Sequence, residues 1–135
     1  MDFPEKLAPI FKQLNKEEVI TKEIIHDLSE FFPLEKVLKA IEYVSMGRIH
    51  DYIFKPSNRR CWFVTGREHS YYLIPHRFCS CKDYFLKGII RNKFYLCKHL
   101  LGQVIYENLN KDKNTQSEGQ SFNDEEFWEV FRDCI

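Results

Sequence analysis

Two closely spaced pairs of metal-binding residue types place the strongest constraint on how this chain can fold. Cys79 and Cys81 are separated by one residue, as are Cys97 and His99, and 15 residues lie between the two pairs. In extended backbone, the side chains of residues i and i+2 point to the same side, so both thiolates of the first pair can reach one ion. An apolar stripe at helical spacing follows the second pair, which predicts that Cys97 lies before a helix and His99 in its first turn. The four side chains can therefore converge on one ion.

Zinc is the ion that this ligand set favours. Three thiolates and one imidazole complete the tetrahedral coordination of a zinc ion, as in structural sites, whereas a catalytic site keeps one position for water. The chain has five cysteines, an odd number, and its N-terminus lacks the pattern of a secretory signal, so metal binding is favoured over disulfide bonds. The alternative, unrelated buried cysteines and a surface histidine, does not account for two pairs with the same spacing. We predict one structural Zn²⁺.

Four other residues of these types are assigned different roles. His76 and Asp83 lie near the first pair and could compete for the ion, but we expect them on the surface or beside the ligands. Cys61 lies in a predicted strand and is expected to be a small buried apolar residue. Cys134 is expected to be an exposed residue near the chain end.

Apolar residues at helical spacing predict a first helix near the N-terminus. Its apolar positions run from Phe3 to Leu14, and Asp2 with Glu5 has the spacing of a capping box. Pro9 should interrupt this helix or restart it, because proline has no backbone N–H to donate.

Two more helices are predicted to follow. Thr21 can cap the second helix, Pro33 begins the third, and Gly47 is expected to end it. The inward faces are expected to be Ile24, Ile25, Leu28, Phe31 and Phe32 in the second helix and Leu34, Val37, Leu38, Ile41 and Val44 in the third.

After Gly47 the sequence changes from helical to strand periodicity. Residues 48–54, 60–65 and 70–75 are rich in β-branched and aromatic types, and segments of turn composition separate them, which predicts a three-stranded antiparallel meander. Residues 83–90 predict a short helix between the two ligand pairs, and the stripe after His99 predicts a longer one. The predicted fold class is α+β: N-terminal helices, the meander, and then a CxC…CxH zinc knuckle with helices.

A polar segment divides the chain near its C-terminus. Residues 1–109 are predicted to form a single zinc-finger domain with a helical N-terminal part, and residues 110–120 a flexible linker. Residues 121–135 are predicted to form an acidic and aromatic helix. No stretch approaches the roughly 20 apolar residues of a membrane span, so we expect no membrane association and a location in the cytosol or the nucleus.

The formal net charge is zero, but the charge is unevenly distributed. Residues 47–100 carry 11 basic and three acidic side chains, a formal excess of +8, and both flanking regions are acidic. A basic middle between acidic flanks suggests one surface that faces a polyanion or an acidic protein.

The motif CSC-x15-CKHLL resembles the SWIM-type zinc finger, in which CxC is followed after a variable gap by CxH and an apolar helix. Together with the helical front half, the strands around Arg59, Arg60 and Gly66, and the short chain, it resembles the small SWIM proteins of the Shu complex over roughly residues 21–109. Gly102 departs from the alanine usual at this position in such proteins. The resemblance implies pairing with a RecA-like recombinase paralogue, and the pair would promote recombinase filament assembly on single-stranded DNA during homologous recombination. It also implies a nuclear location, alone or together with a cytoplasmic one.

Basic side chains of the middle region are candidates for contact with single-stranded DNA or with the partner. They are interleaved with Phe94 and Tyr95, and basic groups with aromatic rings can combine phosphate contact with base stacking. For the isolated protein a solvated basic face is the simpler interpretation. The candidates are Arg59, Arg60, Arg67, Lys87, Arg91, Lys93 and Lys98.

The predicted C-terminal helix offers a second candidate contact surface. Phe127, Trp128 and Phe131 share one side of it, which suits a groove in another protein or packing onto the core of this chain. The polar linker before the helix favours the partner.

Three functional hypotheses remain. The first is a non-enzymatic interaction subunit in recombinational repair, whose partner supplies any ATP chemistry because this chain has no GxxxxGK[ST] phosphate loop. The second is an autonomous nucleic-acid-binding zinc finger with a role in transcription or related to transposases. The third is a zinc enzyme, against which the closed ligand set argues.

Overall fold

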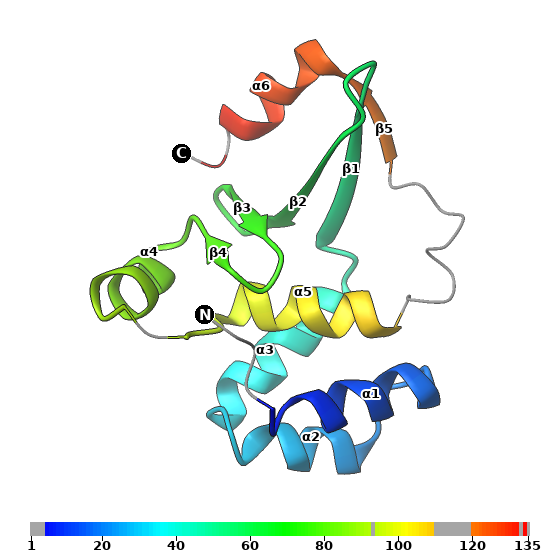
Figure 1. Cartoon of the computed structure of the whole chain (residues 1–135), viewed down its shortest axis with the longest axis vertical. Coiled ribbons are helices and arrows are strands. Elements are labelled where there is room, and N and C mark those ends of the chain that lie inside the picture. Colours follow the sequence, from blue (N-terminus) through cyan, green and yellow to red (C-terminus); the bar gives the residue numbers. More distant parts are fainter. Residues whose placement is uncertain (1–4, 93, 110–119, 133, 135) are drawn as a thin grey trace.

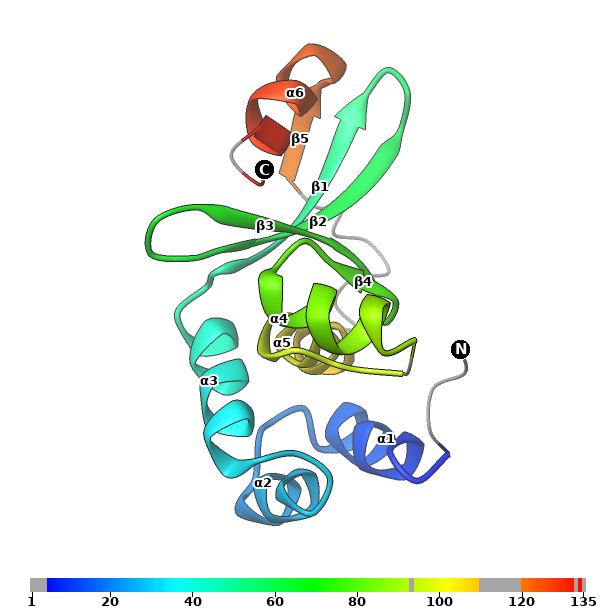
Figure 2. The same cartoon turned by 90° about the vertical axis from the view of Figure 1, so that its left-hand side faces the viewer.

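The protein is built in layers around a twisted sheet (Figure 1). The computed structural model describes residues 5–92, 94–109, 120–132 and 134. Helix α6 covers one face of the sheet, and a group of helices covers the other (Figures 1 and 2). This arrangement confirms the predicted α+β class.

The N-terminal helices are α1 (Ala8–Glu17), α2 (Lys22–Ser29) and α3 (Leu34–Ser45). Pro9 stands in the first turn of α1, where its missing N–H leaves no hydrogen bond unmade, so it begins the helix instead of interrupting it. The capping box predicted at Asp2 and the first apolar position, Phe3, lie outside the described residues. Thr21 caps α2 as predicted, because its side chain accepts a hydrogen bond of 3.2 Å from the backbone N–H of Ile24.

The inward face of α3 differs from the predicted one. Leu34 and Leu38 are 52% and 49% exposed, although both were expected to face the core. The buried residues of the helix are Val37, Ala40 and Tyr43, which recur every three positions along the side that packs on α5. The small side chain of Ala40 lets the two helices approach closely, so contact with α5 determines which side of α3 turns inward.

Four consecutive strands form an antiparallel meander, and a fifth strand extends it. The strands are β1 (Ile49–Lys55), β2 (Arg59–Thr65), β3 (Ser70–Ile74), β4 (Phe78–Cys79) and β5 (Gln120–Asn123), in the sheet order β4-β3-β2-β1-β5. The three predicted strands are confirmed. The two added strands are short: β4 pairs with the end of β3, and β5 pairs in parallel with β1.

Strand β2 is buried on both faces because different helices cover the two sides of the sheet. Trp62 and Val64 pack in the main core with α1, α3 and α5. Cys61 and Phe63 point the other way, into a smaller core that Phe127 of α6 closes. Cys61 is thus the small buried residue that was predicted, and the sheet separates two hydrophobic clusters.

The C-terminal segment returns to the sheet. The helix expected over residues 121–135 is shorter at its N-terminal end: α6 spans Asp124–Arg132, because residues 120–123 form β5. The hydroxyl of Ser57, at the β1–β2 turn, donates a hydrogen bond of 2.5 Å to Asp124. Cys134 was expected to be exposed but is only 5% exposed, because it packs in the smaller core after α6. The linker predicted at 110–120 lies outside the described residues up to position 119.

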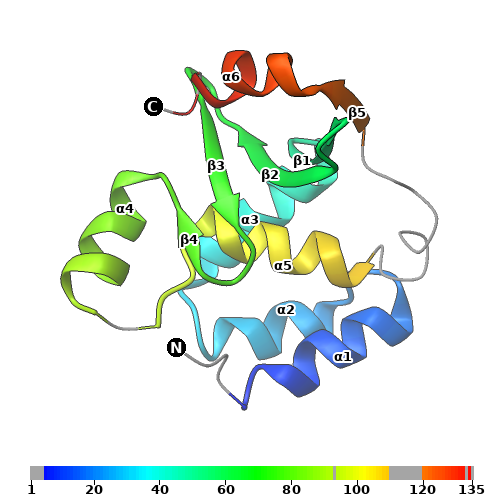
Figure 3. The same cartoon turned by 45° about the horizontal axis from the view of Figure 1, so that its top comes forward.

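The remaining helices lie between the sheet and the N-terminal helices or project from the side. Helix α5 (Lys98–Leu109) runs between the sheet and α1 (Figure 1). Helix α4 (Lys82–Tyr84) continues into the wider turns of η1 (Phe85–Ile90), and together they stand out beside β4 (Figure 3). Among the described residues, no helix has the length and apolar character needed to cross a membrane.

Gly102 should be essential for the close crossing of α3 and α5. A Cβ atom at this position would lie 3.2 Å from the backbone oxygen of Ala40 and 3.1 Å from Cδ1 of Ile49. Gly102→Val should therefore lower the free energy of unfolding by about 1–3 kcal/mol, because the larger side chain must push the helices apart. Chemical denaturation measures this change. Lys12→Val, at an exposed position of α1, is the control and should change stability by no more than about 0.5 kcal/mol; equal stability losses in both variants would contradict the explanation.

Candidate metal centre

The four predicted ligands come together where the edge of the sheet meets α5. Cys79 ends β4, Cys81 precedes α4, Cys97 precedes α5, and His99 lies in the first turn of α5. Their ligand atoms all lie within 4.8 Å of one another, and all four residues are buried. The extended backbone of the first pair and the helix entry of the second thus have the local structures that their spacing predicted.

His99 directs one ring nitrogen to the cysteines. Its Nδ1 lies 3.7 Å from the Sγ of Cys79 and 3.9 Å from the Sγ of Cys97. The other nitrogen, Nε2, lies 3.4 Å from the hydroxyl of Tyr43. If Nδ1 binds a metal ion, Nε2 carries the proton and donates a hydrogen bond to the hydroxyl of Tyr43, which fixes the orientation of the imidazole.

Aromatic rings enclose the histidine. The ring of Tyr71 stacks on His99 with centroids 4.2 Å apart, and the ring of Tyr43 lies 5.3 Å away on a tilted plane. The sequence did not indicate these two tyrosines, because they lie 56 and 28 positions from His99 and belong to α3 and β3. They limit the access of water to the site and hold the ring in place.

Backbone N–H groups donate hydrogen bonds to two of the sulfur atoms and so favour their thiolate forms. The N–H of Tyr84 donates to the Sγ of Cys81 at 3.4 Å, and the N–H of Leu100 donates to the Sγ of Cys97 at 3.5 Å. Both N–H groups lie at the start of a helix, where the backbone dipoles favour an anion. These contacts support bound thiolates and fix the directions of both side chains.

The three thiols cannot all ionise without a compensating cation. Hydrogen bonding to Cys81 raises the pKa of Cys79, and burial raises the pKa of Cys97 to about 12, whereas hydrogen bonds from both thiols lower the pKa of Cys81. A divalent cation would stabilise all three thiolates and displace the remaining protons. The buried Cys₃His cluster is therefore suited to one structural zinc ion. Its four side chains would complete the tetrahedral coordination and leave no coordination position for a catalytic water.

The other two candidate ligands are engaged elsewhere. His76 lies in the β3–β4 turn, and its Nε2 is 3.1 Å from a carboxylate oxygen of Glu107. Asp83 accepts a hydrogen bond of 2.5 Å from the hydroxyl of Tyr95. The expectation that both lie outside the ligand set is consistent with these contacts.

The predicted basic residues do not form one uniform patch. The guanidinium of Arg60 binds both carboxylate oxygens of the buried Asp51, one of them at 2.8 Å. The guanidinium of Arg59 lies 4.7 Å from the ring centroid of Phe127. Arg91 is exposed at the end of η1, and Lys93 lies outside the described residues.

Two of the predicted cations do converge. Arg67 and Lys98 line a hollow of about 590 Å³ together with two cations that were not predicted, Lys39 and Arg48. Sequence offered little sign of this convergence, because the four residues come from α3, the α3–β1 connection, the β2–β3 turn and α5. The hollow is also lined by aromatic and acidic side chains, namely Tyr43, His69, Tyr71, Glu42 and Glu68.

The sequence left open whether the aromatic residues of α6 pack on the core of this chain or contact another protein, and the structure differs from residue to residue. Phe127 is buried against the sheet, with its ring 5.2 Å from that of Phe54, and Phe131 packs edge-on against Tyr72 at the same distance. Trp128 is 63% exposed. Of the three, Trp128 is the side chain available to another molecule.

The buried CxC…CxH cluster between a sheet edge and an apolar helix has the ligand arrangement of a SWIM-type zinc finger. The chain is 29% identical over 107 residues to the "Zinc finger SWIM domain-containing protein 7 homolog" of Dictyostelium discoideum, across 76% of this chain and 68% of that protein. No family model matches the chain. The resemblance predicted from the ligand motif is thereby confirmed.

Removal of one ligand should unfold the protein. Structural zinc contributes an apparent ~10–16 kcal/mol, as much as the whole stability of a small domain, so Cys97→Ser should aggregate or lose its cooperative unfolding transition. Elemental analysis should find one zinc per chain in the parent protein. Cys61→Ala is the matched control, since this buried cysteine lies in the other core, and it should retain the zinc. A folded parent protein without zinc would contradict the assignment.

Tyr43 should control how tightly the zinc is held. Tyr43→Phe removes the hydroxyl that contacts His99 Nε2 and keeps the ring, so zinc affinity should fall about 10–100-fold. Competition with a chromophoric chelator measures the affinity. Tyr71→Phe keeps the ring that stacks on His99 and is expected to bind zinc as the parent protein does. Equal affinities in all three proteins would show that the Tyr43 contact does not tune the metal.

Proposed function

We propose that this protein is a non-enzymatic, zinc-binding interaction subunit of a nuclear DNA-repair complex. It pairs with a RecA-like recombinase paralogue, and the pair promotes recombinase filament assembly on single-stranded DNA in homologous recombination. The partner supplies the ATP chemistry, because this sequence contains no GxxxxGK[ST] motif. Similarity to a SWIM zinc-finger protein supports the proposal, as does the structural character of the metal cluster.

The observation that carries the proposal is the apolar surface of the projecting helix. Phe85, Leu86, Ile89 and Ile90 of η1 are all exposed, Ile90 by 63%. Four large apolar side chains on six consecutive residues are unusual for a surface that meets only water, and such surfaces mark contacts with other proteins. The zinc cluster anchors the segment at both ends, since Cys81 precedes it and Cys97 follows it. The metal can thus present this helix rigidly to a partner.

A second candidate function is direct binding of single-stranded nucleic acid. The basic hollow lined by Arg48, Arg67 and Lys98 favours it, because the aromatic rings of His69 and Tyr71 lie beside these cations. Salt-dependent DNA binding by the isolated protein, lost in Arg48→Glu with Arg67→Glu, would favour this candidate. DNA binding that requires the partner favours the first.

Disruption of the projecting helix should abolish pairing without unfolding the chain. Ile89→Asp with Ile90→Asp should leave the zinc content unchanged and prevent co-purification with the RecA-like paralogue of the same organism. Val19→Asp is the control, because Val19 is an exposed apolar residue between α1 and α2.

Co-expression with the partner should raise the yield and melting temperature of the parent protein, since a partner present at about 100 times its Kd adds about 2.7 kcal/mol to the free energy of unfolding. A parent protein that is stable and monodisperse alone, and that pairs with no recombinase paralogue, would refute the proposal.

A further inference from the structure

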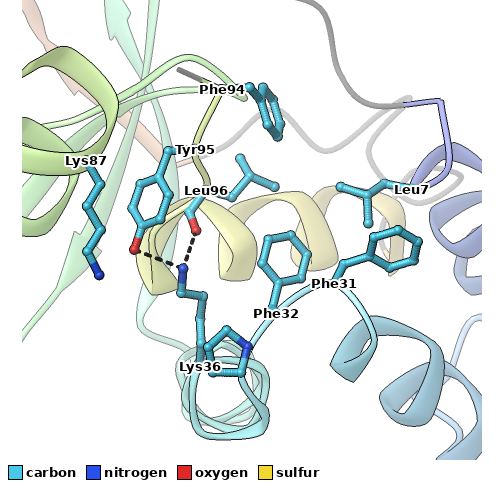
Figure 4. Close-up of a pocket in the computed structure, with 9 residues that line it drawn as sticks. Leu7, Phe31, Phe32, Lys36, Lys87, Phe94, Tyr95 and Leu96 are labelled. Carbon is cyan, nitrogen blue, oxygen red and sulfur yellow. Dashed lines mark hydrogen bonds between the residues drawn. The ribbon is translucent and has the colours of Figure 1, made fainter. Parts of the chain in front are cut away.

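A hollow of about 420 Å³ opens between the α2–α3 corner and the segment that leads into α5 (Figure 4). Its walls are largely apolar. Phe32 and Phe94 point into the space from opposite sides, and Leu7 faces it from the N-terminal segment (Figure 4). The lining is completed by Phe31, Pro33 and Leu96, with Lys36, Tyr95 and Lys87 at one end. We call this hollow the Lys36 groove.

The ammonium group of Lys36 closes the polar end of the groove, 4.1 Å from the ring centroid of Tyr95. Its Nζ donates to the hydroxyl of Tyr95 at 2.9 Å and to the carbonyl oxygen of Leu96 at 3.0 Å. Both acceptors are neutral, and an ammonium group has three donors. Partial burial lowers the pKa of Lys36, since desolvation disfavours its charged form. A carboxylate that enters the groove would supply a third acceptor and an opposite charge.

A second cation stands on the same side of the groove. Lys87 Nζ lies 5.7 Å from the ring centroid of Tyr95 and 3.4 Å from a carboxylate oxygen of Asp83. Asp83 also accepts the hydrogen bond from Tyr95, so this carboxylate is shared between two partners. Lys36 and Lys87 thus place two cations at this end of the groove.

The lining favours a peptide over a nucleic acid. Leucine and proline side chains form part of the wall, and they suit a bulky apolar side chain better than a stacked base. Glu35 and Asp83 border the adjoining hollow on the other side of Lys36, where they would repel a regularly charged phosphate backbone. A peptide can place a single carboxylate at Lys36 and avoid both acidic residues.

The rim of the groove shows that its own chain leaves apolar surface open. Phe31 lines the groove and is 43% exposed, although it was expected to face inward. A bound segment would cover this side chain, which gives the groove an apolar contribution to binding in addition to the charge pair.

We infer that the Lys36 groove docks a short segment of a protein partner in which a bulky apolar residue lies next to an aspartate or glutamate. The apolar side chain fills the space between Phe32 and Phe94, and the carboxylate pairs with Lys36. The inference rests on the proposed function in one respect: the segment belongs to the protein with which this subunit assembles.

Selection from a random peptide library against the zinc-loaded full-length protein tests the groove directly. The enriched peptides should share an acidic residue beside an aromatic or large aliphatic one. Lys36→Glu should weaken their binding at least about tenfold, and replacement of the acidic residue by lysine in the peptide should restore binding to that variant. Lys22→Glu, at the exposed start of α2, is the control and should bind the original peptides normally. If Lys36→Glu loses its zinc, Phe31→Asp replaces it and should show the same loss.

Two results would overturn the inference. One is a selection that enriches no such motif, or peptides that bind the groove variants and the parent protein equally. The other is single-stranded oligothymidine that displaces the peptides in a Lys36-dependent manner, which would make the groove a nucleic-acid site. The recombinase paralogue is absent from this experiment. A negative result therefore leaves the proposed pairing intact, and failed pairing in co-expression would leave a demonstrated peptide groove intact.

Discussion

Convergence of three cysteines and one histidine at the edge of the sheet is the constraint on which the rest of the structure depends. The cluster joins β4, the projecting α4–η1 segment and the start of α5, three elements that share little other contact. The thiols are buried and hydrogen-bonded to one another, so without a metal they add charge and desolvation costs to the fold. With zinc, the same cluster fixes the position of η1 and the direction in which α5 enters the core. The apolar surface and the Lys36 groove both lie next to elements held in this way.

Helix α5 transmits this constraint to the rest of the molecule. It packs on α3 through Gly102 and Ala40, and its residues from His99 to Ile105 are buried. Tyr43 of α3 then contacts the histidine ligand, so the helix packing and the metal site determine each other's geometry. The smaller core on the other side of the sheet is separate, which explains how Cys61 can be a buried cysteine with no part in metal binding.

Sequence predicted what depends on local spacing and missed what depends on distant contacts. The four ligands, the Thr21 cap and the three long strands follow from short patterns, and each is found where expected. The orientation of α3 could not be predicted, because Leu34 and Leu38 are as apolar as the residues that are buried. Strands β4 and β5 are too short to show a period of two, and the burial of Cys134 depends on a fold-back to the sheet. Tyr43 lies 56 positions from His99, beyond any motif.

Strand β5 covers a backbone edge that β1 would otherwise expose. It pairs in parallel with β1 at one edge of the sheet and comes from the C-terminal part of the chain. If that segment detached, the backbone N–H and C=O groups along β1 would become an open edge beside the aromatic side chains of Phe54 and Phe63. Open edges with apolar neighbours pair readily with strands of other chains. The C-terminal segment thus covers the backbone edge of β1, and both the pairing of β5 and the packing of Phe127 in the smaller core hold it there.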